Sequence, residues 1–158
     1  MADRDADPAT LVADADVLAV DLLVGGPARR VLDEVRRHSW LTLLASDPLL
    51  DDAEAVVADL ADAALATDWR GRLEELCTLV DHPAGDHPAL ACAYHGGAGH
   101  LLTYDQRLRD VRAGANLRGV MDVSVRDPDA FAAVFDAASL YEAVHDEPYP
   151  GPDRDPRA

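Results

Sequence analysis

The chain has 158 residues, which is enough for one domain with a sizeable core and too few for two ordinary domains. It carries 30 acidic residues against 14 basic ones, a net charge of -16, so its overall field repels polyanions at low salt. No run of about 18 apolar residues exists, which excludes a membrane span, and the two isolated cysteines, Cys77 and Cys92, are too few for a zinc cluster or a disulfide scaffold.

Because acidic residues are so common in this chain, a single aspartate is weak evidence for a functional site. Aspartate accounts for 24 of the 30 acidic residues, and all 14 basic residues are arginine. At molar salt the Debye length shrinks to about 3 Å, and such a surface stays hydrated. The composition resembles that of proteins from salt-in halophilic archaea, so we expect most acidic side chains to be solvated. The N-terminal segment lacks the basic and then apolar order of a signal peptide, and we expect a soluble cytoplasmic protein.

Apolar runs of strand length alternate with segments of helical periodicity along the chain. Pro27 starts one helix after the Gly25-Gly26 turn, and Ser46, followed by Pro48, caps the start of another. Gly96-Gly97 ends a small alanine-rich helix. We expect strands at 11–15, 40–45, 100–103 and 120–125, and helices at 17–38 (broken at 25–27), 46–65, 69–80, 88–94 and 127–144.

This alternation predicts an α/β fold, namely a three-layer α/β/α sandwich on a mostly parallel sheet of four or five strands. The domain would span residues 10–144. Residues 1–9 are polar and are expected to be flexible. The tail from 145 to 158 is rich in proline and aspartate and is expected to be disordered.

Acidic and hydroxyl side chains follow three of the predicted strands. Asp14 and Asp16 stand at the carboxyl end of the first strand, Ser46 follows the second, and Asp105 comes just after the third. In parallel α/β sheets the ligand crevice lies beyond the carboxyl ends of the strands, so we expect these groups to share one edge. Carboxylates gathered there would bind a divalent cation or take up protons.

Four segments of the chain resemble motifs of PIN-domain nucleases. Asp14-Ala-Asp16-Val-Leu18 is similar to the opening Asp-Thr-Asn-Val-Leu motif, and Leu101-Leu-Thr103-Tyr-Asp105 is similar to the later Thr-x-Asp strand end. Asp86 begins an apolar, alanine-rich helix as in the family, and the segment from 122 to 131 is similar to the closing strand and its following helix. The match spans residues 11–144, nearly the whole predicted domain, and implies a PIN-like fold.

The resemblance also implies a set of metal-binding and catalytic carboxylates. Asp14 and Asp105 would be the central metal ligands, with Asp86 and a second acid as flanking or water-mediated ligands. The family normally places that second acid, usually a glutamate, one or two turns into the helix after the second strand. Asp52 falls at this position, and its neighbours Asp51 and Glu54 compete with it.

Further residues would support this set. Asp16 would assist the metal ligands or replace the polar residue that usually occupies its place, and Thr103 would orient Asp105 through its hydroxyl. Ser46 caps the helix that leaves the same edge. The basic residues that could contact phosphate near the metal are Arg107, Arg109 and Arg112.

The activity implied by the resemblance is metal-dependent cleavage of RNA phosphodiester bonds. One or two Mg²⁺ or Mn²⁺ ions would lower the pKa of a bound water and stabilise in-line displacement at phosphorus. RNA would be the substrate. Since free-standing PIN domains of this length are often toxins of toxin–antitoxin pairs, an antitoxin protein and a second copy of the chain are further expected partners.

A second interpretation stands beside this one. Aspartate is a favoured N-cap, so each of the site aspartates could simply start a helix or turn. Gln106-Arg107 also stands where the family often carries another acid, and Asp52 is one methylene shorter than the usual glutamate. The alternative function is therefore a PIN-like domain with a degraded site, acting as an RNA-binding or protein-interaction module.

Four histidines cluster in sequence around the alanine-rich helix: His82, His87, His95 and His100. His87 and His95 are about two helical turns apart, which is too wide for joint ligation of one metal ion. We expect these histidines to be solvated or to cap helices.

Overall fold

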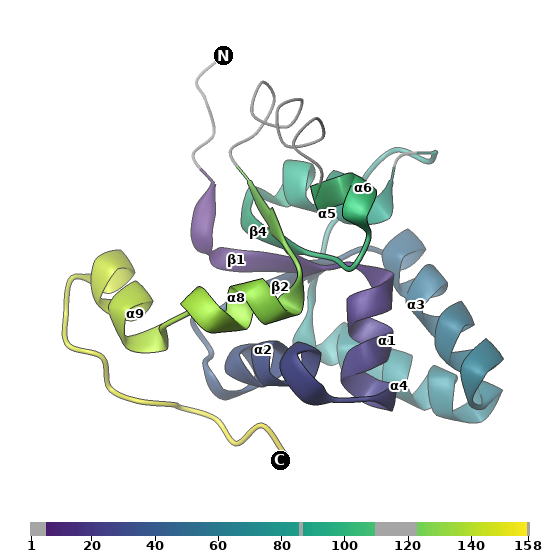
Figure 1. Ribbon diagram of the computed structural model, residues 1–158, viewed down its shortest axis with the longest axis horizontal. Coiled ribbons are helices and arrows are strands. Elements are labelled where there is room, and N and C mark those ends of the chain that lie inside the picture. The colour runs from purple at the N-terminus through teal and green to yellow at the C-terminus, as the bar shows by residue number, and fades with distance from the viewer. Residues whose placement is uncertain (1–5, 86, 110–122, 158) are drawn as a thin grey trace.

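The computed structural model describes residues 6–85, 87–109 and 123–157 of the chain. Five strands form one parallel sheet in the order β3-β2-β1-β4-β5, and helices cover both of its faces (Figure 1). The predicted three-layer α/β/α sandwich is therefore confirmed. The strands are β1 (Asp7–Ala13), β2 (Thr42–Ala45), β3 (Thr78–Leu79), β4 (Ala98–Leu102) and β5 (Ser124–Arg126).

The central strand β1 is apolar over most of its length because both faces of the sheet are covered. Leu11, Val12 and Ala13 are at most 2% exposed. In the sheet register Val12 pairs with Leu44 of β2, and Ala13 pairs with Leu102 of β4. The carboxyl ends of these three strands therefore lie at the same edge of the sheet.

The helices form two layers around the sheet. Figure 1 shows the first four helices on one side of β1 and α5 on the other, where α5 contacts β1, β2 and β4. On the first side α1 packs against α2 and α3, α3 against α4, and α2 against α8. The helices are α1 (Ala15–Leu23), α2 (Gly26–Arg37), α3 (Asp47–Leu60), α4 (Ala63–Leu76), α5 (Pro88–Gly96), α6 (Gln106–Arg109), α8 (Pro128–Val134) and α9 (Ala137–His145).

Most predicted elements are present with shifted ends. The break predicted in the first helical segment separates α1 from α2, and both of its glycines adopt positive φ angles, 95° at Gly25 and 61° at Gly26. Only glycine reaches this region at low cost, so the pair fixes the position of the turn. At the N-terminus β1 begins at Asp7, so residues 7–9 belong to the strand rather than to a flexible segment.

Two helix predictions are wrong in part. The helix expected at 69–80 is α4, which starts earlier because Asp62 accepts a hydrogen bond from the N–H of Leu65. Its expected last turn is instead β3, whose two residues pair with β2; a strand this short leaves no periodicity to detect. The helix expected at 127–144 is divided into α8 and α9, because Asp136 caps α9 by accepting from Ser139.

The tail, expected to be disordered from residue 145, is ordered against α2 over residues 146–157. The Tyr149 hydroxyl bonds to Nε2 of the buried His38, and Arg154 donates to the carbonyl oxygens of Val35 and His38. Arg157 pairs with both carboxylate oxygens of Asp33, at 2.9 and 2.7 Å. The prolines stiffen this segment, and its polar side chains find partners at the carboxyl end of α2.

Both cysteines of the chain, Cys77 and Cys92, carry free thiols. Burial raises the pKa of the Cys77 thiol, and the neighbouring Cys92 raises it further, to about 12.

Across the described part of the chain, no helix combines the length and apolarity needed to cross a bilayer.

Candidate metal centre at the carboxyl edge of the sheet

The strand order creates a switch point between β1 and β4. From β1 the chain moves to β2 and β3 on one side, and it then returns to the other side of β1 for β4 and β5. In open parallel sheets, ligands bind outside the carboxyl ends of the strands at such a switch point. Asp14 follows β1, while Thr103 and Asp105 follow β4. The fold thus places three predicted site residues where a ligand crevice is expected.

Thr103 connects the two aspartates. Its hydroxyl donates to Asp14 Oδ2 at 2.8 Å and accepts the backbone N–H of Asp105 at 3.0 Å. The Thr103 side chain is fully buried, so both bonds are shielded from water. The other oxygen of Asp14 accepts the N–H of Ala15 at 2.8 Å and caps α1. The capping role and the site position of Asp14 are therefore properties of the same side chain.

Asp16 carries a buried carboxylate oxygen without a hydrogen-bond partner among the described residues. Its Oδ2 accepts the N–H of Tyr104 at 3.1 Å, whereas Oδ1 is buried and unpaired. Burial raises the pKa of Asp16, the charge of Asp14 raises it further, and Asp105 adds a smaller effect. A carboxylate in this setting is stabilised by a proton or by a cation. The oxygen donors at this edge therefore fit a hard divalent cation, which binds carboxylate oxygens.

Asp105 lies among donors and positive charges instead. Its Oδ1 accepts the backbone N–H of Arg107 at 2.9 Å, and Arg107 Nε lies 3.5 Å from the same oxygen. The backbone hydrogen bond from Arg107 lowers the pKa of Asp105, and the charges of Arg107 and His87 lower it further. His87 is exposed at the start of α5, so the rim of the site carries two basic side chains.

The structure separates the three residues that compete for the second acidic position. Arg70 of α4 pairs with Asp51, and the same nitrogen lies 3.0 Å from Glu54. Asp52 is exposed on α3 and makes no hydrogen bond or ion pair within the described residues. Asp52 is therefore the unpaired carboxylate of the three, and its place beside a metal stays a prediction.

Ser46, at the carboxyl end of β2, bonds to a histidine as well as to its own helix. The buried Oγ caps α3 by accepting the N–H of Leu49 at 3.2 Å, and it lies 2.8 Å from His82 Nε2. His82 Nδ1 lies 3.0 Å from the carbonyl oxygen of Pro83, which can only accept, so Nδ1 carries the proton and Nε2 accepts from Ser46. His82, which was expected to be solvated or to cap a helix, is partly buried and ties the segment after β3 to α3 through this bond.

The predicted phosphate-binding arginines have different surroundings. The Arg107 side chain is 92% exposed at the rim of the site. Arg109 pairs instead with Asp127 Oδ2 at 3.2 Å and donates to the carbonyl oxygen of Tyr104 at 3.3 Å. Arg109 therefore stabilises the segment after β4, and Arg107 is the one of the two that presents its charge to solvent. Arg112 lies outside the described residues.

Asp86 also lies outside the described residues. Within 6–85, 87–109 and 123–157, no three His, Cys, Asp or Glu side chains lie close enough together to hold one metal ion. The described part of the site is thus an open acidic edge formed by Asp14, Asp16 and Asp105, rather than a closed cage of ligands.

The sequence reasoning missed the acidic residues that follow β5. Asp127 caps α8, and it also pairs with Arg109 at the same sheet edge. Burial and the charges of Asp129, Asp16 and Asp127 raise the pKa of Tyr104. The strand-end rule that identified Asp14 could have found Asp127, which directly follows β5.

Comparison with known proteins gives one result. Among curated proteins none matches the chain. A family model described as "Family of unknown function (DUF7384)" matches residues 5–157, almost the whole length. The chain therefore belongs to DUF7384, a family of unknown function.

Proposed function

We propose that the protein is a divalent-cation-dependent ribonuclease with a PIN-like site at the carboxyl edge of β1 and β4. The observation that carries the proposal is the buried Oδ1 of Asp16, which has no hydrogen-bond partner among the described residues. The negative charges of Asp14 and Asp105 contribute to the raised pKa of this carboxyl group. Carboxylates gathered in this way repel one another unless a cation or a proton is present. The resemblance of Asp14-Ala-Asp16 and Thr103-Tyr-Asp105 to PIN-domain motifs supports the same assignment.

The side chains at this edge have distinct proposed roles. Asp14 and Asp105 hold Mg²⁺ or Mn²⁺, and Asp16 lies beside them, where burial and the charge of Asp14 raise its pKa. When bound, the cation neutralises phosphate charge and lowers the pKa of the attacking water. Thr103 is a positioning residue, because one hydroxyl fixes the side chain of Asp14 and the backbone of Asp105. The full proposed ligand set is Asp14, Asp52, Asp86 and Asp105, with Asp16 as a supporting residue.

RNA is the proposed substrate because the rim carries exposed basic groups next to the acidic edge. Arg107 is exposed, and His87 lies close enough to affect Asp105 electrostatically. The net charge of -16 opposes RNA binding at low salt. At molar KCl the Debye length falls to about 3 Å, so direct contacts at the rim outweigh the repulsion of the whole surface. Cleavage is therefore expected to need high salt as well as a divalent cation.

The test is cleavage of a mixed-sequence, fluorescently labelled RNA in molar KCl with Mg²⁺ or Mn²⁺. The wild type should cleave, chelation by EDTA should stop the reaction, and Asp14→Asn should lower the rate at least about 100-fold, as expected for loss of a central metal ligand. Asp68→Asn, an exposed carboxylate of α4, is the matched control and should cleave at the wild-type rate. Equal activity of the wild type and Asp14→Asn, or cleavage that persists in EDTA, would contradict the proposal.

One observation favours the alternative of a degraded site that binds RNA or protein. The guanidinium of Arg107 lies 3.5 Å from the Asp105 carboxylate, and Arg107 stands where the resembled family often carries another acid. In that case the RNA would be retained in a gel-shift assay without being cleaved. Arg107→Gln would weaken this retention, whereas Asp14→Asn would leave it unchanged.

The toxin role and its antitoxin partner rest on the sequence resemblance alone. If the protein is a toxin, its induced expression in a host that maintains high internal salt should arrest growth. Asp14→Asn expressed to the same level should not, and growth arrest by both proteins would contradict the role.

A further inference from the structure

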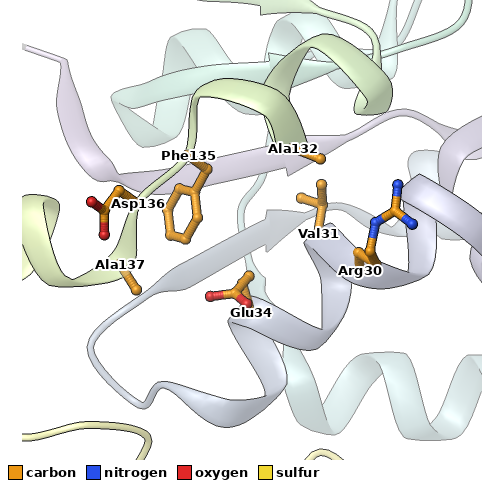
Figure 2. A pocket seen from close by; sticks show the side chains of 7 residues that line it. All are labelled: Arg30, Val31, Glu34, Ala132, Phe135, Asp136 and Ala137. Atoms are coloured by element: carbon orange, nitrogen blue, oxygen red, sulfur yellow. The ribbon is translucent and has the colours of Figure 1, made fainter.

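A cavity of about 430 Å³ lies between α2 and the junction of α8 with α9 (Figure 2), and no residue of the acidic edge lines it. Arg30, Val31 and Glu34 line it from α2, and Ala132, Phe135 and Asp136 line it from α8 and the start of α9. Its volume lies within the range of small-molecule sites, about 300–1,000 Å³. The proposed ribonuclease activity does not use any of these residues.

Arg30 places at this cavity a positive charge that has no partner within the described residues. Its side chain is exposed, and its guanidinium makes no hydrogen bond or ion pair within the described residues. Most other described arginines, by contrast, are engaged, as Arg36 is with Asp21 and Asp33. In a protein with 30 acidic residues and 14 basic ones, an unpaired arginine at a cavity can accept an anionic ligand group.

Glu34 brings a negative charge one helical turn away. Arg30 and Glu34 are four residues apart on α2, a spacing that brings Cβ atoms within about 5–6 Å and allows an ion pair. No such pair forms here, and the Glu34 carboxylate accepts no hydrogen bond from the described residues. Its nearest cationic atoms, Arg37 Nη1 and His38 Nδ1, are each 3.7 Å away. The carboxylate of Asp136 adds negative field at the same end, although its oxygens are occupied in capping α9.

The wall between the two charges is apolar. Val31 forms it from α2, where it is 2% exposed, and Phe135 and Ala132 form it from the other side. Figure 2 shows Arg30 at one end, Asp136 at the other, and Val31 and Phe135 between them. A ligand that satisfies all of these groups carries an anionic group, a nearby cationic group and an apolar body.

We propose that this cavity binds a small zwitterion with an apolar side chain, namely a free apolar or aromatic amino acid. The carboxylate of the ligand pairs with Arg30, its ammonium group pairs with Glu34, and its side chain packs between Val31 and Phe135. This assignment is independent of the proposed ribonuclease site, so each can fail without the other.

The test compares three probes that share one phenyl ring: L-phenylalanine, phenethylamine, which lacks the carboxylate, and 3-phenylpropionate, which lacks the ammonium group. Each is titrated into the full-length protein in molar KCl while the amide NMR signals of Val31 and Phe135 are followed. Phenylalanine should bind about tenfold or more tightly than either analogue, the gain expected from one direct charge-assisted hydrogen bond at a partly exposed site.

Variants assign the two charges. Arg30→Gln should abolish the advantage of phenylalanine over phenethylamine, and Glu34→Gln should abolish its advantage over 3-phenylpropionate. Arg72→Gln is the matched control, because Arg72 is exposed on α4, has no partner within the described residues and does not line the cavity. The amide spectrum itself reports whether each variant is folded. The proposal is overturned if phenylalanine shifts neither signal, if all three probes bind equally, or if both variants bind like the wild type.

Discussion

At the scale of single residues, the hydroxyl of Thr103 is the group that unites the two strand ends. A buried threonine could equally have been a core residue, since its methyl group packs like that of valine. Its hydroxyl instead donates to Asp14 and accepts from the backbone of Asp105, so the geometry of both aspartates depends on one oxygen atom. Buried hydrogen bonds of this kind are costly to remove because both former partners are left unsatisfied.

Replacing Thr103 with valine keeps the shape and removes the hydroxyl. We expect Thr103→Val to lower the free energy of unfolding by about 1–3 kcal/mol, and to abolish RNA cleavage. Thr103→Ser keeps the hydroxyl and loses one methyl group, which costs about 1 kcal/mol. Chemical denaturation measures the stability of both variants, and the cleavage assay distinguishes them. Thr103→Ser should retain activity, although it loses a similar amount of stability. If valine cleaves as well as serine, Thr103 does not position the site.

Asp16 makes stability depend on pH in an unusual direction. Burial and the charge of Asp14 raise its pKa in the folded state, so the folded protein holds this proton more tightly than the unfolded chain does. Without divalent cations, Asp16 lowers the free energy of unfolding least below its unfolded pKa of about 3.9, where the carboxyl group is protonated in both states. The unfavourable contribution grows as the pH rises through the raised folded pKa. Above that window Asp16→Asn should be more stable than the wild type, by less than about 1 kcal/mol because the carboxyl group is only partly buried and solvent screens its charge.

The measurement is thermal unfolding in EDTA across this pH range. The advantage of Asp16→Asn should vanish in acid, and millimolar Mg²⁺ should stabilise the wild type more than the variant. A variant that is less stable than the wild type at neutral pH in EDTA would show that Asp16 has no unfavourable ionisation to relieve.

At the scale of elements, the approach of β1 to β4 sets the edge where the site lies. Gly99 of β4 has no room for a side chain: an added Cβ would lie 2.6 Å from the carbonyl oxygen of Asp7 and 3.0 Å from the Cα of Pro8. Both neighbours are backbone atoms, so they cannot rotate away. The pairing of β1 with β4 therefore depends on glycine at this position.

Gly99→Ala is expected to reduce the free energy of unfolding by about 1–3 kcal/mol, because the backbones of two strands must move apart. Gly71→Ala in α4 is the matched control, since an added Cβ meets nothing within 4 Å. It should stabilise the protein by up to about 1 kcal/mol through the helix propensity of alanine. Urea denaturation measures both. A Gly99→Ala protein as stable as the wild type would mean that the strands separate without cost.

The elements that could be predicted from the sequence are those with their own local signal. Pro27, Ser46 and Gly97 mark helix ends in any context, and the apolar run through Val12 indicates a buried strand. The strand β3 was missed because its two residues are specified only by pairing with β2. The junction at Asp136 was missed because aspartate is common throughout this chain, so one capping aspartate does not stand out within a helical pattern.

The site followed the same division. The placement of Asp14 and Asp105 at one sheet edge could be predicted, because Asp14 directly follows β1, Asp105 comes shortly after β4, and a parallel sheet brings strand ends together. The competition among Asp51, Asp52 and Glu54 could not be resolved from the sequence, because it depends on Arg70 of α4, which pairs with two of the three.

At the scale of the whole molecule, the tail over residues 146–157 packs against α2 and is part of the folded domain. Its expected disorder rested on proline content, which measures backbone stiffness and says nothing about side-chain partners. Arg154 satisfies carbonyl groups at the end of α2, and Arg157 joins a line of charges that continues through Asp33 and Arg36 to the buried Asp21. The tail thereby links the carboxyl end of the chain to α1.

Removing the tail after Asp146 should lower the free energy of unfolding by about 2–3 kcal/mol, since several hydrogen bonds of about 1 kcal/mol each are lost and His38 is uncovered. Arg157→Gln alone should cost less than about 1 kcal/mol, because this arginine is more than half exposed. Guanidinium denaturation in molar KCl measures both. If the truncated chain unfolds at the wild-type midpoint, the tail makes no energetic contribution.

The central claim is that the edge formed by Asp14, Asp16 and Asp105 binds a divalent cation, and the binding of Mn²⁺ tests it most directly. Substoichiometric Mn²⁺ is added to the metal-free protein in molar KCl, and paramagnetic broadening of the amide NMR signals is followed. We predict that the signals of Asp16, Tyr104 and Asp105 broaden first and that Asp14→Asn and Asp105→Asn abolish this preference. Equal or earlier broadening around the acidic groups near Arg70 on α3 and α4, with no effect of either substitution, would contradict the claim.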